Sequence, residues 1–400
     1  MRVKIEKLDH FGRGICYIDG KICFVEDTLP GEEVKVKITL EKKKYMLGRV
    51  KDFYSVSFDR VTEVCPYKDK CGGCDLSHLS YKMENEYKCL KVKEILKKYA
   101  DVDEVLVEDV SFGDEYNYRN KITLHGDHNI IGYYKKNSND IVPINKCLLV
   151  DEKINHIINV INMMSSDNEY KDIIIRVSND GEEVLISITG KVKGYEVLED
   201  LCDSLIINDE VVKGERCIMS FIGEKKFIIS DKGFFQVNKT LTERLYNEVL
   251  NIVKEVKPKK VLDLYCGCGT IGIYISDYVE EVVGVEVFKE SIENAKKNKK
   301  LNNCHNIRFI CDKVENVIDN IKDNTDLVIV DPPRGGLDKT SIDVLLGMNV
   351  NNLVYVSCDP VTLARDIKLL KEKYDVVSVK PFNMFSKTYH VECVCLLKAK

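Results

Sequence analysis

The pattern of apolar and polar residues divides the chain into three parts. Residues 1–54 contain short apolar or alternating segments, separated by turn residues such as Gly12, Asp19-Gly20 and Pro30-Gly31. Alternation interrupted by glycine and proline is typical of short strands joined by turns. We therefore predict a small β-barrel, with strands at residues 3–8, 14–18, 21–25 and 33–40.

The second part, residues 55–237, mixes helical and strand-like patterns. Apolar residues at helical spacing predict helices at residues 83–98, 152–164 and 195–204. Runs of β-branched residues predict strands at residues 121–125, 173–177, 184–189 and 226–229. This mixture predicts a central α+β domain.

The third part, residues 238–400, alternates strands with helices. Asn238 can cap a helix that runs to about Val256. Buried strands are expected at residues 260–265, 282–287, 326–330 and 352–357, and a last strand follows residue 391. This alternation predicts an α/β fold with a Rossmann-like, doubly wound parallel sheet.

Composition places the chain among globular proteins. Its 400 residues are enough for two or three domains, and 44% are hydrophobic and 31% charged. No apolar run approaches the roughly 18 residues of a membrane span, and Met1 to His10 lacks a signal-peptide core. We therefore expect a cytoplasmic protein that does not bind membranes. Because disulfides are rare there, clustered members of its 16 cysteines should be metal ligands or catalysts.

The charge distribution bears on nucleic-acid binding. The net charge of −5 argues weakly against such a partner. Residues 1–54, however, carry twelve Lys and Arg against nine Asp and Glu, and Lys42, Lys43 and Lys44 are consecutive. That run indicates either a solvated hairpin tip or an RNA contact. The aromatic and basic residues between Tyr116 and Lys136 fit either a single-strand RNA groove or an ordinary edge hairpin.

Three cysteines, Cys65, Cys71 and Cys74, lie within ten residues around Gly72-Gly73. This density is hard to explain by packing, and no second Cys or His pair at zinc spacing follows closely. An iron–sulfur cluster needs a fourth thiolate, which can come from far along the chain. We expect a 4Fe-4S cluster with Cys147 as the fourth ligand. Cys89 is nearer, but it lies in a predicted helix.

A glycine loop follows the first strand of the C-terminal part. Cys266 to Gly272 would let the backbone approach a nucleotide, and Glu286, near the end of the next strand, could accept the hydroxyls of a ribose. NAD and S-adenosylmethionine fit these features equally well. The strand that ends at Val330 runs into Asp331-Pro332-Pro333-Arg334, which is typical of the substrate side of methyltransferases.

Cys358 follows the next predicted strand and should reach the same edge of the sheet. A cysteine there can be a buried filler, but beside a ligand crevice it is the better candidate for a nucleophile. Glu392, at the start of the last strand, is a candidate general base.

Two family resemblances add to this reading. Residues 12–15, 19–21 and 29–32 resemble the TRAM domain, a small RNA-binding, OB-like barrel. The whole chain resembles the RNA 5-methyluridine methyltransferases of the RumA and TrmA type. The motifs that carry this resemblance are Cys65-x5-Cys71-Gly72-Gly73-Cys74, Phe235-Gln236-Val237-Asn238, Asp263 to Gly267, Asp331 to Arg334, Ser357 to Pro360, and His390-Val391-Glu392.

The resemblance implies a class I methyltransferase that methylates carbon 5 of a uridine through a covalent adduct. Cys358 would be the nucleophile and Glu392 the base that removes the proton from carbon 5. The resemblance further implies that four residues contact S-adenosylmethionine: Gln236, Tyr265, Glu286 and Asp331. It also implies that four cysteines are the ligands of a 4Fe-4S cluster: Cys65, Cys71, Cys74 and Cys147.

The expected RNA is 23S rRNA, because the ribosomal enzymes of this family usually have both the barrel and the cluster. Transfer RNA is the alternative within the family, and we expect a monomer. Two other classes remain open: an NAD-dependent oxidoreductase with an iron–sulfur domain, and an RNA-binding module without catalysis.

Three positions depart from the pattern of the family. Asp359 stands where Asn is usual and would raise the pKa of the neighbouring thiol, unless it points away or meets a cation such as Arg365. Gly335 replaces a frequent Lys and removes one possible phosphate contact. Thr270 replaces a frequent Asn and could remove one cofactor hydrogen bond.

Overall fold

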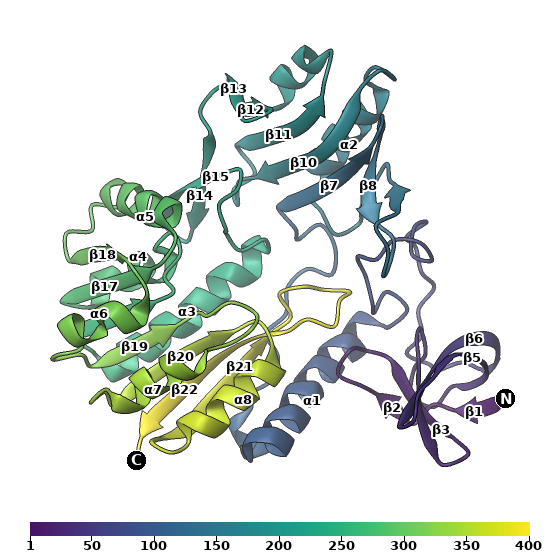
Figure 1. The fold of residues 1–400 in the computed structure, drawn as a ribbon, viewed down its shortest axis with the longest axis horizontal. Coiled ribbons are helices and arrows are strands. Elements are labelled where there is room, and N and C mark those ends of the chain that lie inside the picture. Colours follow the sequence, from purple (N-terminus) through teal and green to yellow (C-terminus); the bar gives the residue numbers. More distant parts are fainter.

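The structure, a computed structural model, describes residues 1–400 (Figure 1). It contains a six-stranded sheet, a seven-stranded central sheet, a two-stranded hairpin and a seven-stranded C-terminal sheet. None of its helices combines the length and the apolar character that crossing a bilayer requires.

The N-terminal sheet is the predicted barrel, with strand order β1-β5-β6-β4-β3-β2. Its core contains buried residues such as Ile5, Val25 and Val34. Three of the predicted strands are confirmed, and the one predicted at residues 3–8 is divided into β1 and β2, which pair with different strands. The final strand was missed because much of it is polar and exposed. Lys42 to Lys44 lie between β5 and β6, at a hairpin tip. The strands are β1 (Arg2–Lys4), β2 (Lys7–Leu8), β3 (Gly14–Ile18), β4 (Lys21–Val25), β5 (Glu33–Glu41) and β6 (Tyr45–Ser55).

A segment without regular structure carries the three clustered cysteines and leads to helix α1 (Tyr81–Ala100). Val92, Ile95 and Leu96 of α1 are buried in the core of the C-terminal sheet. The helix also lies along α8 (Pro360–Leu370), as Figure 1 shows. Helix α1 lies within residues 55–237 of the sequence, yet it packs with the C-terminal core. The predicted domain of residues 55–237 therefore stays a prediction.

The central sheet has the order β13-β12-β11-β10-β7-β8-β9. Its apolar face packs against α2, and their shared core includes Ile157, Ile173 and Ile186. The elements are η1 (Glu104–Leu106), β7 (Lys121–Asp127), β8 (Ile130–Tyr134), β9 (Ile141–Pro143), α2 (Glu152–Met163), β10 (Glu169–Val177), β11 (Val184–Lys191), η2 (Tyr195–Leu201), β12 (Ser204–Ile207) and β13 (Glu210–Lys213).

The helix predicted at residues 195–204 is wrong in type and in its end. Residues Tyr195–Leu201 form only a short 3₁₀ helix, whose preceding Gly194 provides no side-chain cap. β12 begins at Ser204, is buried along its whole length and pairs in parallel with β11. Burial in the sheet therefore overrides the helical spacing.

The hairpin of β14 (Cys217–Ile222) and β15 (Lys225–Ser230) connects the central sheet to the C-terminal core. Its Phe227 and Ile229 are buried against α3 (Lys239–Val256). Asn238 caps α3 as predicted, and its Oδ1 accepts a hydrogen bond of 3.1 Å from the Leu241 amide.

The C-terminal sheet has the order β18-β17-β16-β19-β20-β22-β21. The predicted parallel sheet is confirmed except for β22, which runs antiparallel to both of its neighbours. No helix connects β21 to β22, so the chain returns in the opposite direction. The elements are β16 (Lys260–Leu264), α4 (Thr270–Ile275), η3 (Ser276–Tyr278), β17 (Glu281–Glu286), α5 (Lys289–Leu301), β18 (Ile307–Cys311), α6 (Val314–Ile321), β19 (Leu327–Val330), α7 (Lys339–Gly347), β20 (Asn352–Ser357), β21 (Tyr374–Phe382) and β22 (Glu392–Ala399).

Candidate active site

The carboxyl ends of four parallel strands bring the predicted site residues to one edge of the C-terminal sheet. β16 leads into the glycine loop, Glu286 ends β17, Asp331 follows β19 and Cys358 follows β20. Because β22 runs antiparallel to β20, its first residue, Glu392, lies at this same edge. Ligands of open α/β sheets bind at such edges.

The glycine loop turns sharply between β16 and α4. Tyr265, Gly267 and Gly269 all have positive φ angles, of 64°, 53° and 78°. A Cβ on Gly269 would lie 2.6 Å from the Phe309 ring, so a side chain there would clash. The turn therefore ends the strand one residue earlier than predicted.

The four candidate cofactor residues surround this loop. Oε2 of Glu286 accepts a hydrogen bond of 3.2 Å from the Gly267 amide, and the Tyr265 hydroxyl lies 2.7 Å from Oγ of Ser341. The Asp331 amide donates to the Leu264 carbonyl at the end of β16. Gln236 is buried. The segment that carries it is bonded to the loop, because the Phe234 carbonyl accepts a hydrogen bond from the Cys268 thiol.

Cys358, Glu392 and Asp331 are three ionisable side chains near one another, and the pKa of each is raised. Burial raises the pKa of Cys358 to about 12, and the carboxylates of Glu392 and Asp331 act in the same direction. Burial raises the pKa of Glu392 to about 8, with Asp331 adding to the effect. Burial also raises the pKa of Asp331 to about 7. The positive charge of Arg334 opposes the shifts of Cys358 and Glu392.

Asp359 is a helix cap rather than a partner of Arg365. Its Oδ1 accepts a hydrogen bond of 2.8 Å from the Val361 amide at the start of α8. Arg365 instead contacts Asp366, with Nε 2.7 Å from Oδ1, and donates to two backbone carbonyls. The suggested pairing of Asp359 with Arg365 was therefore wrong. The carboxylate still raises the pKa of Cys358, but burial, Glu392 and Asp331 contribute more.

Cys358 opens into a small pocket, here called the Cys358 pocket. The pocket has a volume of about 140 Å³. Against about 30 Å³ per water in the liquid, this is room for one ring rather than for several nucleotides. Its walls come from the barrel, α1, the start of α8 and the segment before β22, and the residues are His10, Phe11, Lys91, Cys358, Asp359, Pro360, Val361, Tyr389, His390 and Val391.

Several residues in the walls of this pocket could not be predicted from the sequence. Phe11 precedes the predicted TRAM turn, but nothing in its local pattern links it to a site in the distant C-terminal part. Lys91 lies within a helix, and its Nζ donates to the Tyr389 carbonyl at 2.7 Å. Only the tertiary arrangement brings these residues to Cys358.

The four predicted cluster ligands line one cavity of about 280 Å³. Cys65, Cys71 and Cys74 come from the loop after the barrel, and Cys147 lies between β9 and α2. No three His, Cys, Asp or Glu side chains in the structure are placed to hold a single metal ion. The cavity is several times the volume of a water, and all four thiols line it. Cys89 lies elsewhere, on α1, with its Sγ 3.6 Å from the Glu108 carbonyl.

The aromatic and basic residues between Tyr116 and Lys136 do not form one groove. Tyr118 is buried and donates to the Ser386 carbonyl. Tyr134 is exposed and stacks on His125, with ring centroids 4.0 Å apart. Lys136 lies near the carboxylates of Glu26 and Asp75. The set therefore divides between structural contacts and the surface.

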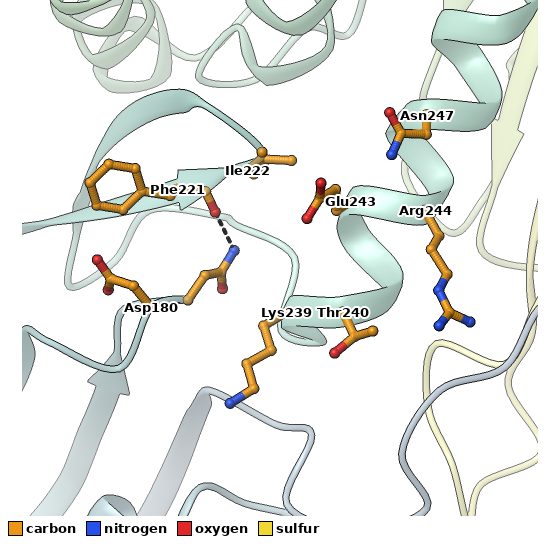
Figure 2. Close-up of a pocket in the computed structure, with 10 residues that line it drawn as sticks. Asp180, Phe221, Ile222, Lys239, Thr240, Glu243, Arg244 and Asn247 are labelled. Carbon is orange, nitrogen blue, oxygen red and sulfur yellow. Dashed lines mark hydrogen bonds between the residues drawn. The ribbon is translucent and has the colours of Figure 1, made fainter.

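A separate polar cavity of about 520 Å³ lies where the central sheet, the β14–β15 hairpin and α3 meet (Figure 2). On one side of it, Nδ2 of Asn179 donates to the Phe221 carbonyl at 2.6 Å. Arg244 on α3 donates to the Phe112 carbonyl at 2.7 Å. None of the predicted site residues lines this cavity, so it is distinct from the edge that carries Cys358.

Comparisons with known proteins extend this picture over the whole chain. Residues 205–400 match the tRNA (Uracil-5-)-methyltransferase family, and residues 1–51 match the TRAM domain. A protein of Clostridium acetobutylicum, named as an uncharacterized RNA methyltransferase, is 35% identical over 99% of this chain and 96% of its own length. The chain belongs to the RNA uracil-5-methyltransferase family.

Other members of this family resemble the chain along its full length. A Staphylococcus aureus protein, also named as an uncharacterized RNA methyltransferase, is 33% identical over 98% of this chain and 96% of its own length. The solved structure of Pyrococcus abyssi tRNA (uracil-54, C5)-methyltransferase with S-adenosyl-L-homocysteine gives a TM-score of 0.79 at 26% identity. The match covers 99% of this chain and 100% of that one. This chain is accordingly a class I, S-adenosylmethionine-dependent RNA methyltransferase.

Proposed function

We propose that this enzyme methylates carbon 5 of a uridine in RNA through a covalent adduct between Cys358 and the uracil ring. The observation that carries this proposal is the meeting of Cys358, Glu392 and Asp331 at the edge of the sheet that also holds the glycine loop. An NAD-dependent oxidoreductase would need the loop but not this cysteine and its two carboxyl groups.

The proposed reaction begins at carbon 6 of the uracil, because carbon 5 is a poor nucleophile on its own. The Cys358 thiolate adds to carbon 6, and the electrons of the carbon 5–carbon 6 double bond move to form an enolate. Carbon 5 then attacks the sulfonium methyl group, and S-adenosylhomocysteine leaves. Glu392 removes the proton from carbon 5, the carbon–sulfur bond at carbon 6 breaks, and Cys358 is released as a thiolate.

The surroundings of Cys358 determine when the thiolate forms. Burial with two carboxyl groups keeps the thiol protonated in the free enzyme, while the Arg334 charge favours the thiolate. The target base must leave its stack to reach Cys358, as enzymes that act on a base require.

The cofactor is assigned to the residues around the glycine loop. Glu286 would accept the ribose hydroxyls of S-adenosylmethionine, since its position at the end of β17 is the usual place for such an acid. Tyr265, Gln236 and Asp331 complete the set, with Asp331 between the methionine part and the target base. When bound, the cofactor supplies the methyl group on a positively charged sulfur.

We assign a 4Fe-4S cluster to the thiols of Cys65, Cys71, Cys74 and Cys147. The support is the cavity that all four line and their soft sulfur chemistry, which suits iron–sulfur clusters. Methyl transfer moves no electrons from a metal, so the group would be structural. The loop that carries it is bonded to the active-site segment, because the amides of Asp75 and Leu76 both donate to the Lys387 carbonyl.

The proposed RNA is 23S rRNA, with tRNA as the second candidate. The barrel and the cysteine loop support the ribosomal RNA assignment through the resemblance to the ribosomal enzymes. The full-length similarity to the Pyrococcus abyssi tRNA enzyme favours tRNA instead. The proposed site of action is the cytoplasm.

The test is methylation of total RNA from a strain that lacks 5-methyluridine, with labelled S-adenosylmethionine. We expect label in 5-methyluridine at a defined position of 23S rRNA, and none with Cys358→Ala. Label confined to tRNA would replace the RNA assignment. No 5-methyluridine with the wild-type enzyme would overturn the proposed reaction.

A further inference from the structure

The turn of the barrel between Asp9 and Arg13 forms part of the wall beside the candidate nucleophile. The rings of Phe11 and Tyr389 meet edge to face, with centroids 5.4 Å apart, and both line the Cys358 pocket. Lys91 on α1 lines the same pocket, with its Nζ 5.1 Å from the centroid of Tyr389. The barrel thus contributes directly to the pocket that holds Cys358.

This turn is held rigidly. The Asp9 carboxylate accepts hydrogen bonds from the amides of Phe11 and Arg13, at 2.9 and 2.8 Å. The Tyr87 hydroxyl of α1 donates to the Asp9 carbonyl at 2.8 Å. Gly12 has a φ of 78°, and a Cβ on it would lie 2.5 Å from a methyl group of Leu76. The backbone at Phe11 is therefore held by the turn, while the residue is 42% exposed.

From Phe11 a row of aromatic and cationic groups, here called the barrel row, continues over the barrel. The Arg13 guanidinium, which is paired with the Asp9 carboxylate, lies over both Phe11 and Phe24, 5.1 and 4.6 Å from the ring centroids. Phe24 is followed by Tyr45, at a centroid distance of 6.1 Å. Tyr45 is next to the exposed Lys42 to Lys44 at the hairpin tip.

Alternating aromatic faces and cations are the means by which proteins bind single-stranded RNA, because every base offers a face for stacking and every phosphate a negative charge. The barrel row ends at the Cys358 pocket, which has room for a single ring. A strand whose target base enters this pocket would have its neighbouring nucleotide beside Phe11.

We propose that Phe11 stacks on the nucleotide next to the target uridine and that the barrel row binds the single-stranded RNA that continues from it. The barrel then positions the target base over Cys358, besides adding affinity. This inference rests on the proposed function, since it places the substrate of the same site.

The test compares Phe11→Ala and Phe11→Trp with Tyr278→Ala in the full-length enzyme. Tyr278 is a matched control: it is 50% exposed, it has the Lys254 Nζ 4.7 Å from its ring, and it lies before β17 at the opposite edge of the sheet. The readouts are kcat and KM for methylation of the RNA substrate, the affinity for S-adenosylmethionine, and photo-crosslinking from a 4-thiouridine placed beside the target.

We expect Phe11→Ala to lower kcat/KM for RNA between about 5-fold and 150-fold, the loss expected for one stacked base. Phe11→Trp should restore most of the activity, Tyr278→Ala should match wild type, and cofactor affinity should not change. The crosslink should map to Phe11 or its neighbours. If the wild type is active and Phe11→Ala is equally active, this inference alone is overturned; if the wild type makes no 5-methyluridine, the proposed function falls with it.

Discussion

Cys358 and Glu392 lie opposite one another at the end of a pair of antiparallel strands. Ser357 of β20 is paired with Cys393 of β22, so the next position on each strand brings the two side chains together. Glu392 accordingly raises the pKa of the Cys358 thiol. A candidate nucleophile and a candidate base thus come from neighbouring strands whose geometry is fixed by backbone hydrogen bonds.

The pH dependence of methylation should follow Glu392. A base with its pKa raised to about 8 is mostly protonated at pH 7, so kcat should rise as the pH increases through about 8. Arg334 lowers the pKa values of both Glu392 and Cys358, and Arg334→Met should therefore move this rise to higher pH. Single-turnover methylation measured across pH provides the check.

The matched control for this shift is Arg308→Met. Arg308 is an arginine on β18 that contacts Glu281, with Nε 3.1 Å from Oε1. Its removal should leave the pH profile where it is. A profile that is unmoved in Arg334→Met would show that the charge of Arg334 does not act on the two groups.

A second prediction concerns the pH dependence of stability. Asp263 is fully buried, and burial raises its pKa to about 7, whereas an unfolded aspartate titrates near 4. Its stabilising contribution is fully present below about pH 4 and is lost as the pH rises through about 7. Asp263→Asn should therefore show a smaller fall in Tm between pH 5.5 and pH 8.5 than wild type, measured without cofactor.

The exposed Asp343 on α7 provides the comparison for that experiment. Asp343→Asn should keep the wild-type fall in Tm. Identical falls in all three proteins would exclude Asp263 as a source of the pH dependence.

A third prediction concerns a buried ionic network that holds the segment before Glu392. The Glu84 carboxylate lies 3.0 Å from Nζ of Lys88 and accepts hydrogen bonds from Asn383 and from the Lys387 amide. All three charged side chains, including Lys387, are almost fully buried. Glu84→Ala should destabilise the fold by about 3–5 kcal/mol, because it leaves the buried Lys88 cation without a carboxylate partner, whereas Lys387 keeps Glu115.

Glu86, two residues along the same helix, is the control for the network. It is 56% exposed and its Oε1 lies 3.8 Å from Nζ of Lys82. Chemical denaturation should give Glu86→Ala a stability close to wild type, as for other exposed pairs. Equal and small losses in both variants would mean that the buried network contributes little.

A fourth prediction addresses the cysteine cavity. Protein purified without oxygen should contain iron and acid-labile sulfide, and Cys74→Ser should lose most of both because it removes one of the four thiols that line the cavity. Cys89→Ser should retain them, since Cys89 lies on α1. If the wild-type protein holds no iron after reconstitution, the assignment of a cluster is contradicted. If Cys89→Ser loses its iron, Cys89 rather than Cys147 is the fourth ligand of the cluster.

The sequence predicted the elements that have strong local patterns. The alternating strands of the barrel, the cap at Asn238 and the strand before Cys358 follow from residue periodicity and capping, and the structure has them within a few residues. The same local rules misassigned residues 195–204, because the burial of β12 depends on its parallel pairing with β11. The direction of β22 was missed for a similar reason, since it depends on the absence of a helix after β21.

Part of the candidate site could be predicted from the sequence, and part could not. Cys358, Glu392 and the cysteine ligands stand in motifs of the family, so their roles could be proposed from the sequence. Phe11 and Lys91 could not be placed beside Cys358, because they lie far from it in sequence and have no pattern that indicates a shared pocket. The role of Asp359 as a cap for α8 likewise became clear only from its bond to the Val361 amide.

The central claim is that Cys358 attacks the uracil ring. Its most direct test is incubation of the enzyme with S-adenosylmethionine and an RNA substrate that carries 5-fluorouridine at the target position. Carbon 5 then has no proton for Glu392 to remove, so the enzyme should stall as a methylated RNA adduct that survives denaturation, with its mass on the peptide that contains Cys358. The Cys358→Ala variant should give none, and Cys311→Ala, which lacks an exposed cysteine on β18, should give the wild-type amount. An active wild-type enzyme that forms no adduct, or an adduct that persists in Cys358→Ala, would contradict the account.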